Sequence, residues 1–572
     1  MHDLVIRGGR VVDGTGSAAR TADVAVSNGI ITEVGRVDGP ARHTVDADGL
    51  MVTPGFVDIH THYDGQATWD PVMTPSSWHG VTTAVMGNCG VGFAPVDPTR
   101  RDWLVGLMEG VEDIPGTALH EGIKWAWETF PEYLNALETL PRVMDVGTHV
   151  PHGAVRAYVM GERGARNEPA TPDDIAAMAA IVKEGVRAGA LGFSMSRTIV
   201  HRAVDGEPVP GTFAAVDEVL GIASVLGELG AGLVELAPAG VVGEDLLAPE
   251  REMAWMREVA GSTGRPVTFV LVQHDSAPGM WKDLLDECTR LRGAGVPLYP
   301  QIHTRSPALL VNLATRLNPF LACPSWAALA GLPVPEVVSR LTADSALRMR
   351  LVAEADAGRD ALAGSMVRFD RMYALGDPPD YEPPASASVA AEAARRGVSE
   401  YEVALEWMMR RNGAEMLEVP ILNWADGNHD VVHEMLLNDT TVLGLGDGGA
   451  HTASIVDSAT PTHMLAYWAR DRRRGLVPFE TCVRKMTSET AALYGLGDRG
   501  VLAPGKRADI NLIDADGVQL LAPEVWFDLP SGAPRLVQGA RGYVGTWVAG
   551  EQTFHHGEPT GARPGRLVRG AR

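Results

Sequence analysis

The sequence predicts an α/β protein, a TIM-like (β/α)8 barrel with a small β-sandwich formed by the N- and C-terminal segments. Three observations lead to this fold class. Both ends of the 572-residue chain alternate apolar and polar residues between turn signals, which is typical of antiparallel strands. Between them, short apolar runs alternate with longer segments of helical periodicity, as in a parallel sheet covered by helices. Eight such runs can be counted, the number that closes a barrel.

The terminal segments, 1–54 and 498–572, are expected to form one small domain. Asn28-Gly29 separates two alternating runs, which is a strong signal for a β-hairpin. Residues 508–516 and 543–559 have the same alternating texture. We therefore expect strands from both chain ends in one small sheet.

The barrel is expected over residues 55–497. Its predicted strands lie within 55–62, 82–90, 144–150, 189–196, 231–238, 266–275, 296–304 and 441–449. Segments between them, such as 172–189, carry helical periodicity and acidic first turns. Residues from about 305 to 440 are too many for one helix and predict an insertion, in which the Pro/Ala-rich stretch 376–397 is interpreted as a loop.

Composition narrows the classes of partner. The formal net charge of −23 argues against a nucleic-acid partner, whose phosphates require a basic surface. Four widely spaced cysteines do not make a disulfide framework, and neither a secretory signal nor a membrane-spanning run is evident. We expect a cytoplasmic protein that acts on a small molecule, without a nucleic-acid or membrane partner. A homo-oligomer is compatible with the sequence, which does not fix the oligomeric state.

Metal-binding residue types stand at the ends of the predicted strands, where the active sites of such barrels lie. The i, i+2 spacing of His60 and His62 places both imidazoles on one face of the first strand. Imidazole, thiolate and carboxylate together form a donor set that suits zinc. A chance His-x-His is disfavoured because further donors stand at other strand ends. The expected ligands of one or two zinc ions are His60, His62, Cys89, Glu235, His274 and Asp447.

Three of these donors have other interpretations. Cys89 lies in GNCG, and its flanking glycines favour close approach to a ligand over a buried core thiol. Glu235 lies inside an apolar strand and requires either a metal or an arginine partner. The stretch around Asp447 matches G-x-G-x-x-G, but no βαβ unit surrounds it. A general acid/base facing the metal fits Asp447 better.

Substrate-binding side chains are expected on the loops that follow strands three, four and seven. An arginine is a natural bidentate anchor for a carboxylate, although each of these arginines can equally be a surface charge. The histidine after strand three can equally be a hydrogen-bonded structural residue. The candidates are His152, Arg197, Arg202, His303 and Arg305.

Several motifs resemble a known family. The segments PGFVDIHTH and GLGDRGVLAPGKRADINLID, with the GDGG aspartate, resemble the amidohydrolase superfamily. HGVTTAVMGNCGVG and TGARPGRLVRG resemble its N-acyl-D-amino-acid deacylases (the D-aminoacylase-like family). The resemblance spans the chain and is patchy across 305–440. It implies a β-sandwich from both chain ends, and Cys89 in place of the carboxylated lysine of related barrels. The metal ligands it implies are His60, His62, Cys89, His274 and Asp447.

The sequence departs from the family pattern at three positions. Glu235 stands where the family has a histidine ligand, and Ser276 stands where it has a lysine that holds the substrate carboxylate. The arginine expected soon after Asp447 is missing, and the first one downstream is Arg470. These departures bear on the acyl-D-amino-acid specificity, not on the hydrolytic core.

The expected function is therefore that of a zinc-dependent amidohydrolase. Metal-bound hydroxide would attack a linear amide, most readily that of an N-acyl-D-amino acid or a similar N-acyl compound, with Asp447 as general base and then acid. The missing carboxylate anchors favour an alternative on the same core, the hydrolysis of a cyclic amide, carbamate or lactone. A non-catalytic scaffold is a remote alternative, because such a protein would have lost its ligand residues freely.

Overall fold

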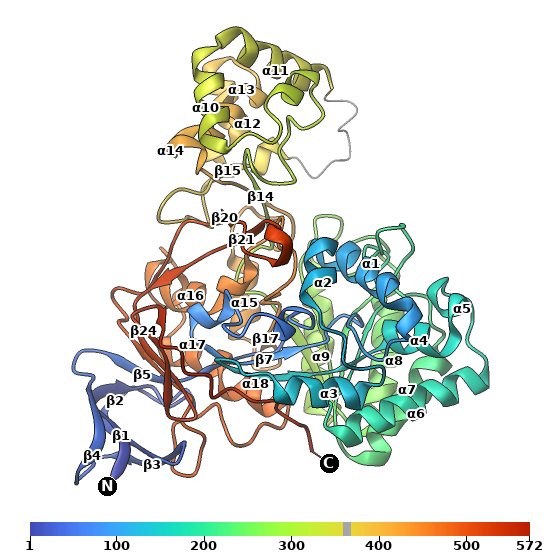
Figure 1. The fold of residues 1–572 in the computed structure, drawn as a ribbon, viewed down its shortest axis with the longest axis vertical. Helices are drawn as coiled ribbons and strands as arrows, with labels where there is room; N and C mark the ends of the chain where they lie inside the picture. The colour runs from blue at the N-terminus through green and yellow to red at the C-terminus, as the bar shows by residue number, and fades with distance from the viewer. Residues whose placement is uncertain (359–367, 572) are drawn as a thin grey trace.

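Three regions make up the protein (Figure 1). The structure, a computed structural model, describes residues 1–358 and 368–571. A sheet built from both chain ends lies beside a core of parallel strands with covering helices, and a largely helical insertion projects from one end of the molecule. Within the described residues, no helix combines the length and apolarity needed to cross a bilayer.

The two chain ends share one nine-stranded sheet, as predicted. Its central contact is the antiparallel pair of β5 (Met51–Pro54) with β18 (Ile510–Ile513). Asn28 and Gly29 have φ of 53° and 73° and form the predicted hairpin turn. The remaining strands are β1 (His2–Val11), β2 (Arg20–Ser27), β3 (Ile30–Gly35), β4 (Ala41–Asp46), β23 (Tyr543–Val548), β24 (Glu551–His555) and β25 (Glu558–Pro559).

The last residues of the chain leave this sheet and run along the parallel core. Val146, in β8 (Asp145–Thr148), donates its N–H to the Arg566 carbonyl at 3.0 Å and accepts from the Val568 N–H at 2.7 Å. Two short ribbons from the same terminal segment lie outside the nine-stranded sheet: β19 (Gln519–Leu520) with β22 (Ala540–Arg541), and β20 (Glu524–Trp526) with β21 (Arg535–Val537). The predicted terminal domain 498–572 therefore contains segments that belong to different parts of the fold.

Each of the eight predicted barrel runs contains a parallel strand. The strands form a three-stranded sheet, β6-β7-β8, and a six-stranded sheet, β9-β10-β11-β12-β13-β17. Apart from β8, their bounds are β6 (Phe56–Asp58), β7 (Val81–Met86), β9 (Val150–Pro151), β10 (Phe193–Ser196), β11 (Val234–Ala237), β12 (Val267–Val270), β13 (Leu298–Ile302) and β17 (Val442–Leu443).

The two parallel sheets meet at both of their edges. Only His149 separates β8 from β9 along the chain. At the other junction, a parallel bridge joins Thr61 to Gly448. Beside it, the Asp447 N–H donates to the His60 carbonyl at 3.0 Å. These contacts bring the segments that follow the first and the eighth strand side by side.

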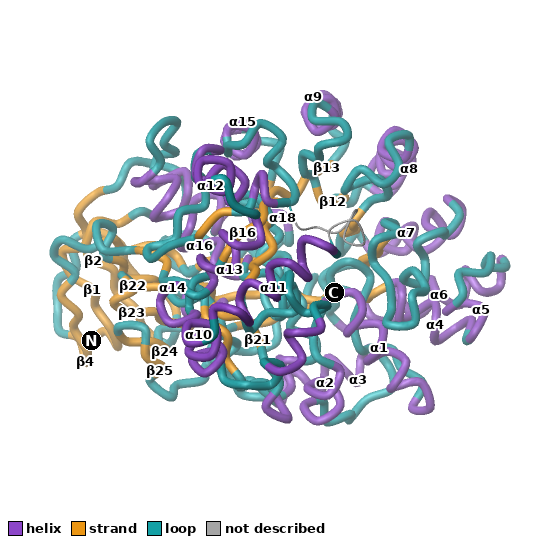
Figure 2. The backbone as a smooth tube through the Cα atoms, turned by 90° about the horizontal axis from the view of Figure 1, so that it is seen from above, coloured by secondary structure: helices purple, strands orange, loops and turns teal. Residues whose placement is uncertain are grey.

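Helices lie outside the parallel strands (Figure 2). Thr171 and Asp174 form a capping box at the start of α6, where the acidic first turn predicted a helix. Gly189 (φ 115°) ends this helix. The apolar faces of these helices share the largest hydrophobic cluster with the strands. The principal helices are α1 (Arg101–Glu112), α3 (Phe130–Thr139), α6 (Pro172–Ala188), α7 (Val216–Leu229), α8 (Ala248–Thr263), α9 (Met280–Gly293), α15 (Asp430–Leu437) and α17 (Phe479–Met486).

The predicted insertion is a subdomain with its own hydrophobic cluster, which includes Leu341, Tyr401 and Leu405. It stands at the top of Figure 1. Its elements include β14 (Ala308–Val311), α10 (Val334–Ala343), α11 (Ser345–Ala357), β15 (Tyr373–Ala374), α12 (Val389–Arg396), α13 (Glu400–Met408), α14 (Arg410–Gly413) and β16 (Leu417–Pro420).

The prediction of a loop over 376–397 is wrong for its last part, where Val389–Arg396 form helix α12. Ser388 caps helix α12 by accepting a hydrogen bond from the Ala391 N–H at 3.2 Å, and Gly397 (φ 68°) ends the helix. The alanines and arginines between them are strong helix formers, so a cap and a stop signal suffice to fix the helix. The prolines, which carried the prediction of a loop, all precede the cap.

Candidate metal centre

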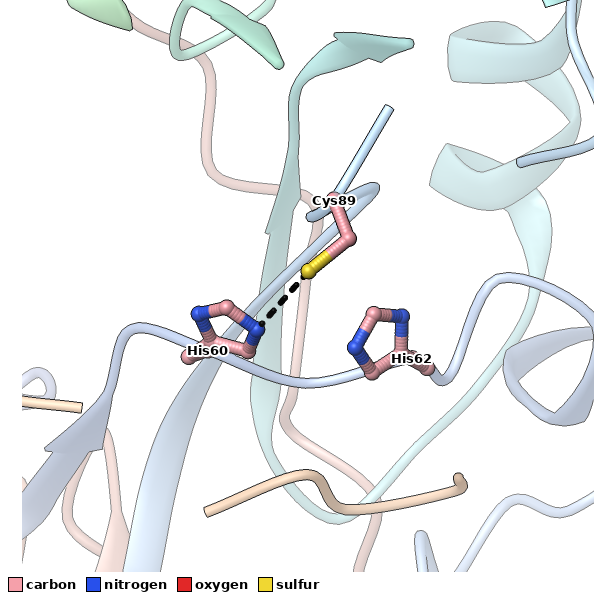
Figure 3. A group of neighbouring side chains, drawn as sticks. All are labelled: His60, His62 and Cys89. Carbon is pink, nitrogen blue, oxygen red and sulfur yellow. Dashed lines mark hydrogen bonds between the residues drawn. The ribbon is translucent and has the colours of Figure 1, made fainter. Parts of the chain in front are cut away.

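Two histidines and a cysteine converge at the ends of the first two parallel strands (Figure 3). His60 and His62 follow β6, and Cys89 follows β7. Their ligand atoms all lie within 4.8 Å of one another, and all three side chains are buried. The Cys89 Sγ lies 3.4 Å from the His60 Nε2. This arrangement is the one expected from the His-x-His spacing and from the position of Cys89.

Asp447 faces the same ring nitrogens from the eighth strand. Its Oδ1 lies 3.5 Å from the His60 Nε2 and 3.6 Å from the His62 Nε2. Its side chain keeps 18% of its accessible surface, whereas the two histidine side chains keep 1% each. Asp447 is therefore a carboxylate of this group that solvent, and hence a substrate, can reach.

The turn that carries Cys89 is shaped by backbone packing. Cys89 has φ 53°, and its N–H donates to the Glu235 Oε2 at 2.8 Å. A Cβ on the next residue, Gly90, would lie 2.7 Å from the Met195 Cα. The glycine that follows Cys89 thus allows close approach to strand β10.

The Nδ1 atom of each imidazole lies beside a buried polar side chain. The His60 Nδ1 lies 2.8 Å from the Gln301 Oε1 on β13, and the His62 Nδ1 lies 3.3 Å from the Glu112 Oε1 at the end of α1. Such partners fix ring orientation in metal sites. Sequence reasoning missed both residues. Glu112 ends an amphipathic helix, where an acidic residue usually faces water, and Gln301 is not a residue type typical of metal ligands.

Burial favours the neutral forms of several acids around the site. Burial raises the pKa of Asp58 and Asp64 to about 7 and that of Glu235 to about 8. Burial also raises the pKa of the Cys89 thiol well above its usual value. A cluster of buried acids is costly unless a positive charge compensates it. The buried or largely buried carboxylates are Asp58, Asp64, Glu112, Glu235 and Asp447.

The residues present fit a metal ion. The His62 Nδ1, the Glu112 Oε1 and the Glu235 Oε1 are buried without a hydrogen-bond partner among the described residues. Two imidazole nitrogens, a thiol and a carboxylate form a mixed donor set that suits zinc. The observed geometry and charge thus agree with the donor chemistry expected from the sequence.

Glu235 lies behind His60 and Cys89. Its Oε1 is 3.6 Å from the His60 Nδ1, the ring nitrogen opposite the one that faces Cys89. Its other oxygen accepts the Cys89 N–H. Within the described residues, the ionisable side chain within 4 Å of Glu235 is this histidine and not an arginine, and desolvation lowers the pKa of His60 to about 4.

His274 is not a member of this group. Strand β12 ends at Val270, so His274 lies beyond the strand on a loop. Its Nδ1 accepts a hydrogen bond from the Ala277 N–H at 3.2 Å, and it lines a small cavity with Val241 and Trp281. The sequence placed His274 at the strand end because the apolar run continues past the last ladder hydrogen bond.

Three of the predicted substrate-binding residues are engaged elsewhere. The His152 Nε2 lies 2.9 Å from the Glu218 Oε1, which matches its structural interpretation. Arg197 pairs with Glu252 at 3.0 Å. Arg202 is exposed and donates to the Gly206 carbonyl at 2.7 Å.

His303 and Arg305 form a buried group of their own. The His303 Nε2 lies 3.3 Å from the Asp457 Oδ2, and an Arg305 Nη lies 3.2 Å from the Asp457 Oδ1. The Arg305 guanidinium also lies 3.9 Å from the centre of the Tyr381 ring. The charge of Arg305 is therefore already matched by a carboxylate.

Two histidines at the centre were not predicted. His451 follows Asp447 by four residues, has φ 50°, and places its Nε2 3.8 Å from the Glu112 Oε2. His201, after β10, has its Nδ1 3.0 Å from the Ser196 Oγ. Desolvation, followed by the charges of His451 and His62, lowers the pKa of His201 to about 3. Their positions on the loops after strands four and eight were the signal available in the sequence.

Comparisons with known proteins show the family and the fold. A family model described as Amidohydrolase family matches residues 43–554. D-aminoacylase of Alcaligenes xylosoxydans xylosoxydans is 27% identical over 99% of this chain and 97% of its own length. N-acyl-D-aspartate deacylase of the same organism is 28% identical over 99% and 95%. The solved structure of N-acyl-D-glutamate deacylase from Bordetella bronchiseptica, complexed with zinc and a phosphonate inhibitor, has a TM-score of 0.65 at 24% identity and covers 99% of both chains, which shows a shared fold.

Proposed function

The chain belongs to the amidohydrolase family, and on that premise we propose that it is a zinc-dependent hydrolase of a linear amide bond. The proposed substrate is an N-acyl-D-amino acid or a similar N-acyl compound. The observation that carries the proposal is the convergence of His60, His62 and Cys89 from two strand ends, with Asp447 facing the same nitrogens. The names of the relatives, which are deacylases of N-acyl-D-amino acids, support the substrate class.

The same four side chains would hold the zinc ion, and Glu235 and Gln301 would hold the ligands in place. When bound, zinc supplies Lewis-acid polarisation of a carbonyl and lowers the pKa of a water molecule from about 16 to about 7. Cys89 and the imidazole Nε2 atoms are buried, so bulk water is excluded from the inner side of the centre.

Asp447 moves the proton in this scheme. Its carboxylate is reachable from solvent, unlike the other acids of the centre, and it adjoins both imidazole Nε2 atoms. An Asp447 oxygen would accept a proton from the attacking water and then deliver it to the departing nitrogen. That delivery is essential, because an amide anion is a very poor leaving group.

Finer features of the prediction also belong to this proposal. We infer that the two parallel sheets act as one closed (β/α)8 barrel over 55–497, and that the smaller domain is the nine-stranded sheet built from the two chain ends. Of the three predicted arginine anchors, Arg197 and Arg305 are paired with carboxylates, whereas Arg202 is exposed and donates to a backbone carbonyl. A cytoplasmic location remains an expectation from the sequence.

The proposal is tested by metal analysis and a substrate panel. Protein purified without chelators should contain one or two zinc ions per chain and should hydrolyse N-acyl-D-amino acids faster than their L-isomers. Chains without zinc that are inactive even after zinc is added would contradict the proposal. Zinc together with activity only on cyclic amides, carbamates or lactones would keep the metal centre and replace the substrate class.

A further inference from the structure

The buried carboxylate of Glu112 contacts both a histidine of the metal centre and a part-exposed histidine beside it. Glu112 is the last residue of helix α1, and its side chain is 2% exposed. Helix α1 lies between the second and third strands, apart from the segments that supply His60, His62, Cys89 and Asp447. The position of Glu112 therefore follows from how this helix ends, and none of the motifs of the sequence includes it.

One carboxylate oxygen of Glu112 faces His62. The Oε1 lies 3.3 Å from the His62 Nδ1, while the Nε2 of the same ring faces the Asp447 Oδ1 at 3.6 Å. Neither the Glu112 Oε1 nor the His62 Nδ1 has a hydrogen-bond partner among the described residues, so this ionic contact is the one that the structure gives to each atom. A proton on Nδ1, on the side of the Glu112 carboxylate, would leave the lone pair of His62 on Nε2, the nitrogen that faces the centre.

The rest of Glu112 faces His451. Its Oε2 lies 3.8 Å from the His451 Nε2, and its backbone carbonyl accepts a hydrogen bond from the His451 N–H. His451 lies four residues beyond Asp447, and its side chain keeps 28% of its accessible surface. Glu112 thus contacts both the buried imidazole of His62 and the part-exposed side chain of His451.

We propose that Glu112 is the positioning residue of this centre: it orients the His62 imidazole for metal binding and holds the part-exposed His451 beside the centre. This inference rests on the proposed metal centre. Because Glu112 contacts two histidines on different loops, its loss should affect metal affinity through His62 and turnover through His451. Loss of the His451 side chain, by contrast, should affect turnover alone.

The experiment uses the full chain and two metal probes, Zn²⁺ and Co²⁺. Glu112→Gln keeps the size of the side chain and removes its charge. We expect it to weaken Zn²⁺ binding about 10- to 100-fold in competition with a chromophoric chelator, the range typical of such outer partners. The ligand-field absorption of bound Co²⁺ should change, while the Cys89 thiolate-to-cobalt band should persist. His451→Asn should lower kcat and leave Zn²⁺ affinity unchanged.

Matched controls separate positioning from stability. Glu109→Gln lies on the same helix three residues earlier and outside the centre, and it should match the wild type in metal affinity. The thermal midpoint of metal-free Glu112→Gln, compared with that of the metal-free wild type, shows that the variant is folded at the temperature at which Zn²⁺ binding is measured. Glu112→Asp, which keeps the charge on a shorter side chain, should bind Zn²⁺ with intermediate affinity and carries the test if Glu112→Gln does not fold.

The outcomes distinguish this inference from the proposed function. A wild-type chain that binds neither ion would overturn the metal centre itself. A wild-type chain that binds zinc, with Glu112→Gln binding as tightly as wild type, would overturn only the role of Glu112. Equal losses of Zn²⁺ affinity in Glu109→Gln and Glu112→Gln would also overturn the role of Glu112, because a general effect on helix α1 would then explain both.

Discussion

The Cys89 N–H donates a hydrogen bond of 2.8 Å to the Glu235 carboxylate. This contact joins the turn after the second parallel strand to the middle of β11, the fifth. Cys89 has φ 53°, a conformation that non-glycine residues adopt only when their surroundings fix it. The acid that the sequence offered as a ligand thus stabilises the turn that presents the thiol.

Removing the acceptor should destabilise this turn. Glu235→Ala leaves the buried Cys89 N–H without a partner, which should lower the free energy of unfolding by about 1–3 kcal/mol. Glu235→Gln retains an acceptor oxygen and should lose less. Urea unfolding of the metal-free proteins measures both. Equal losses of unfolding free energy in the two variants would contradict this prediction, because the stabilisation would then not depend on the hydrogen bond to the Cys89 N–H.

Asp447→Asn should retain the fold and lose most of the turnover. Removal of a general acid/base costs about 10²- to 10⁴-fold in rate, and the amide of Asn cannot accept and return the proton. Steady-state kinetics together with circular dichroism provide the measurement. A kcat near that of wild type would exclude Asp447 from the proton transfer.

Removing the metal should destabilise the chain. The acids Glu112 and Glu235 are buried beside the site, and a bound cation would stabilise their carboxylate forms there. A ligand at 1,000 times its Kd stabilises the folded state by about 4 kcal/mol, so zinc should raise the thermal midpoint of the chelator-treated protein. Magnesium, which prefers oxygen ligands, is the control ion and should not. An unchanged midpoint with zinc would count against the site.

Acid should weaken a contact far from the centre. Burial by itself would raise the pKa of Glu382, but hydrogen bonds from Arg472, the His429 N–H and Tyr467 lower it to about 2. The folded pKa thus lies below the usual value of 4.5, so the stabilisation is complete above about pH 4.5 and is lost as pH falls toward 2. Unfolding followed from pH 6 to pH 3 should show a shallower decline in Glu382→Gln than in wild type. Parallel declines would contradict this assignment.

The insertion should be able to loosen without loss of the metal centre. Leu405 is fully buried in the separate hydrophobic cluster of the insertion. Leu405→Ala should destabilise that cluster by about 2–5 kcal/mol. Limited proteolysis should then cut between residues 308 and 420 while zinc content stays at the wild-type level. A parallel loss of zinc would show that the insertion and the centre unfold as one unit.

Much of the architecture could be predicted because it depends on local pattern. The period-2 alternation of the chain ends, the Asn28-Gly29 turn and the eight apolar runs are each legible within a few residues. Element bounds were less accurate: His274 continues an apolar run but lies four residues beyond the end of β12. Apolar character continues past the point where ladder hydrogen bonds stop, and only the neighbouring strand decides that point.

The inner donors can be predicted from spacing along the chain. His60 and His62 are two residues apart in the segment that follows β6, where Thr61 bridges to Gly448, so local extended geometry is enough to place them on one side. Cys89 and Asp447 stand at strand ends, and parallel strands bring their ends to one edge of the sheet.

The groups that contact these donors from the other side depend on the three-dimensional fold. Glu112 reaches His62 because a helix ends beside the centre, and Gln301 reaches His60 across 241 residues of sequence. Arg197 and Arg305 likewise found partners, Glu252 and Asp457, that no local pattern indicates. The physical reason is that a buried polar group must be paired, and the choice of its partner depends on distances in space rather than on spacing along the chain.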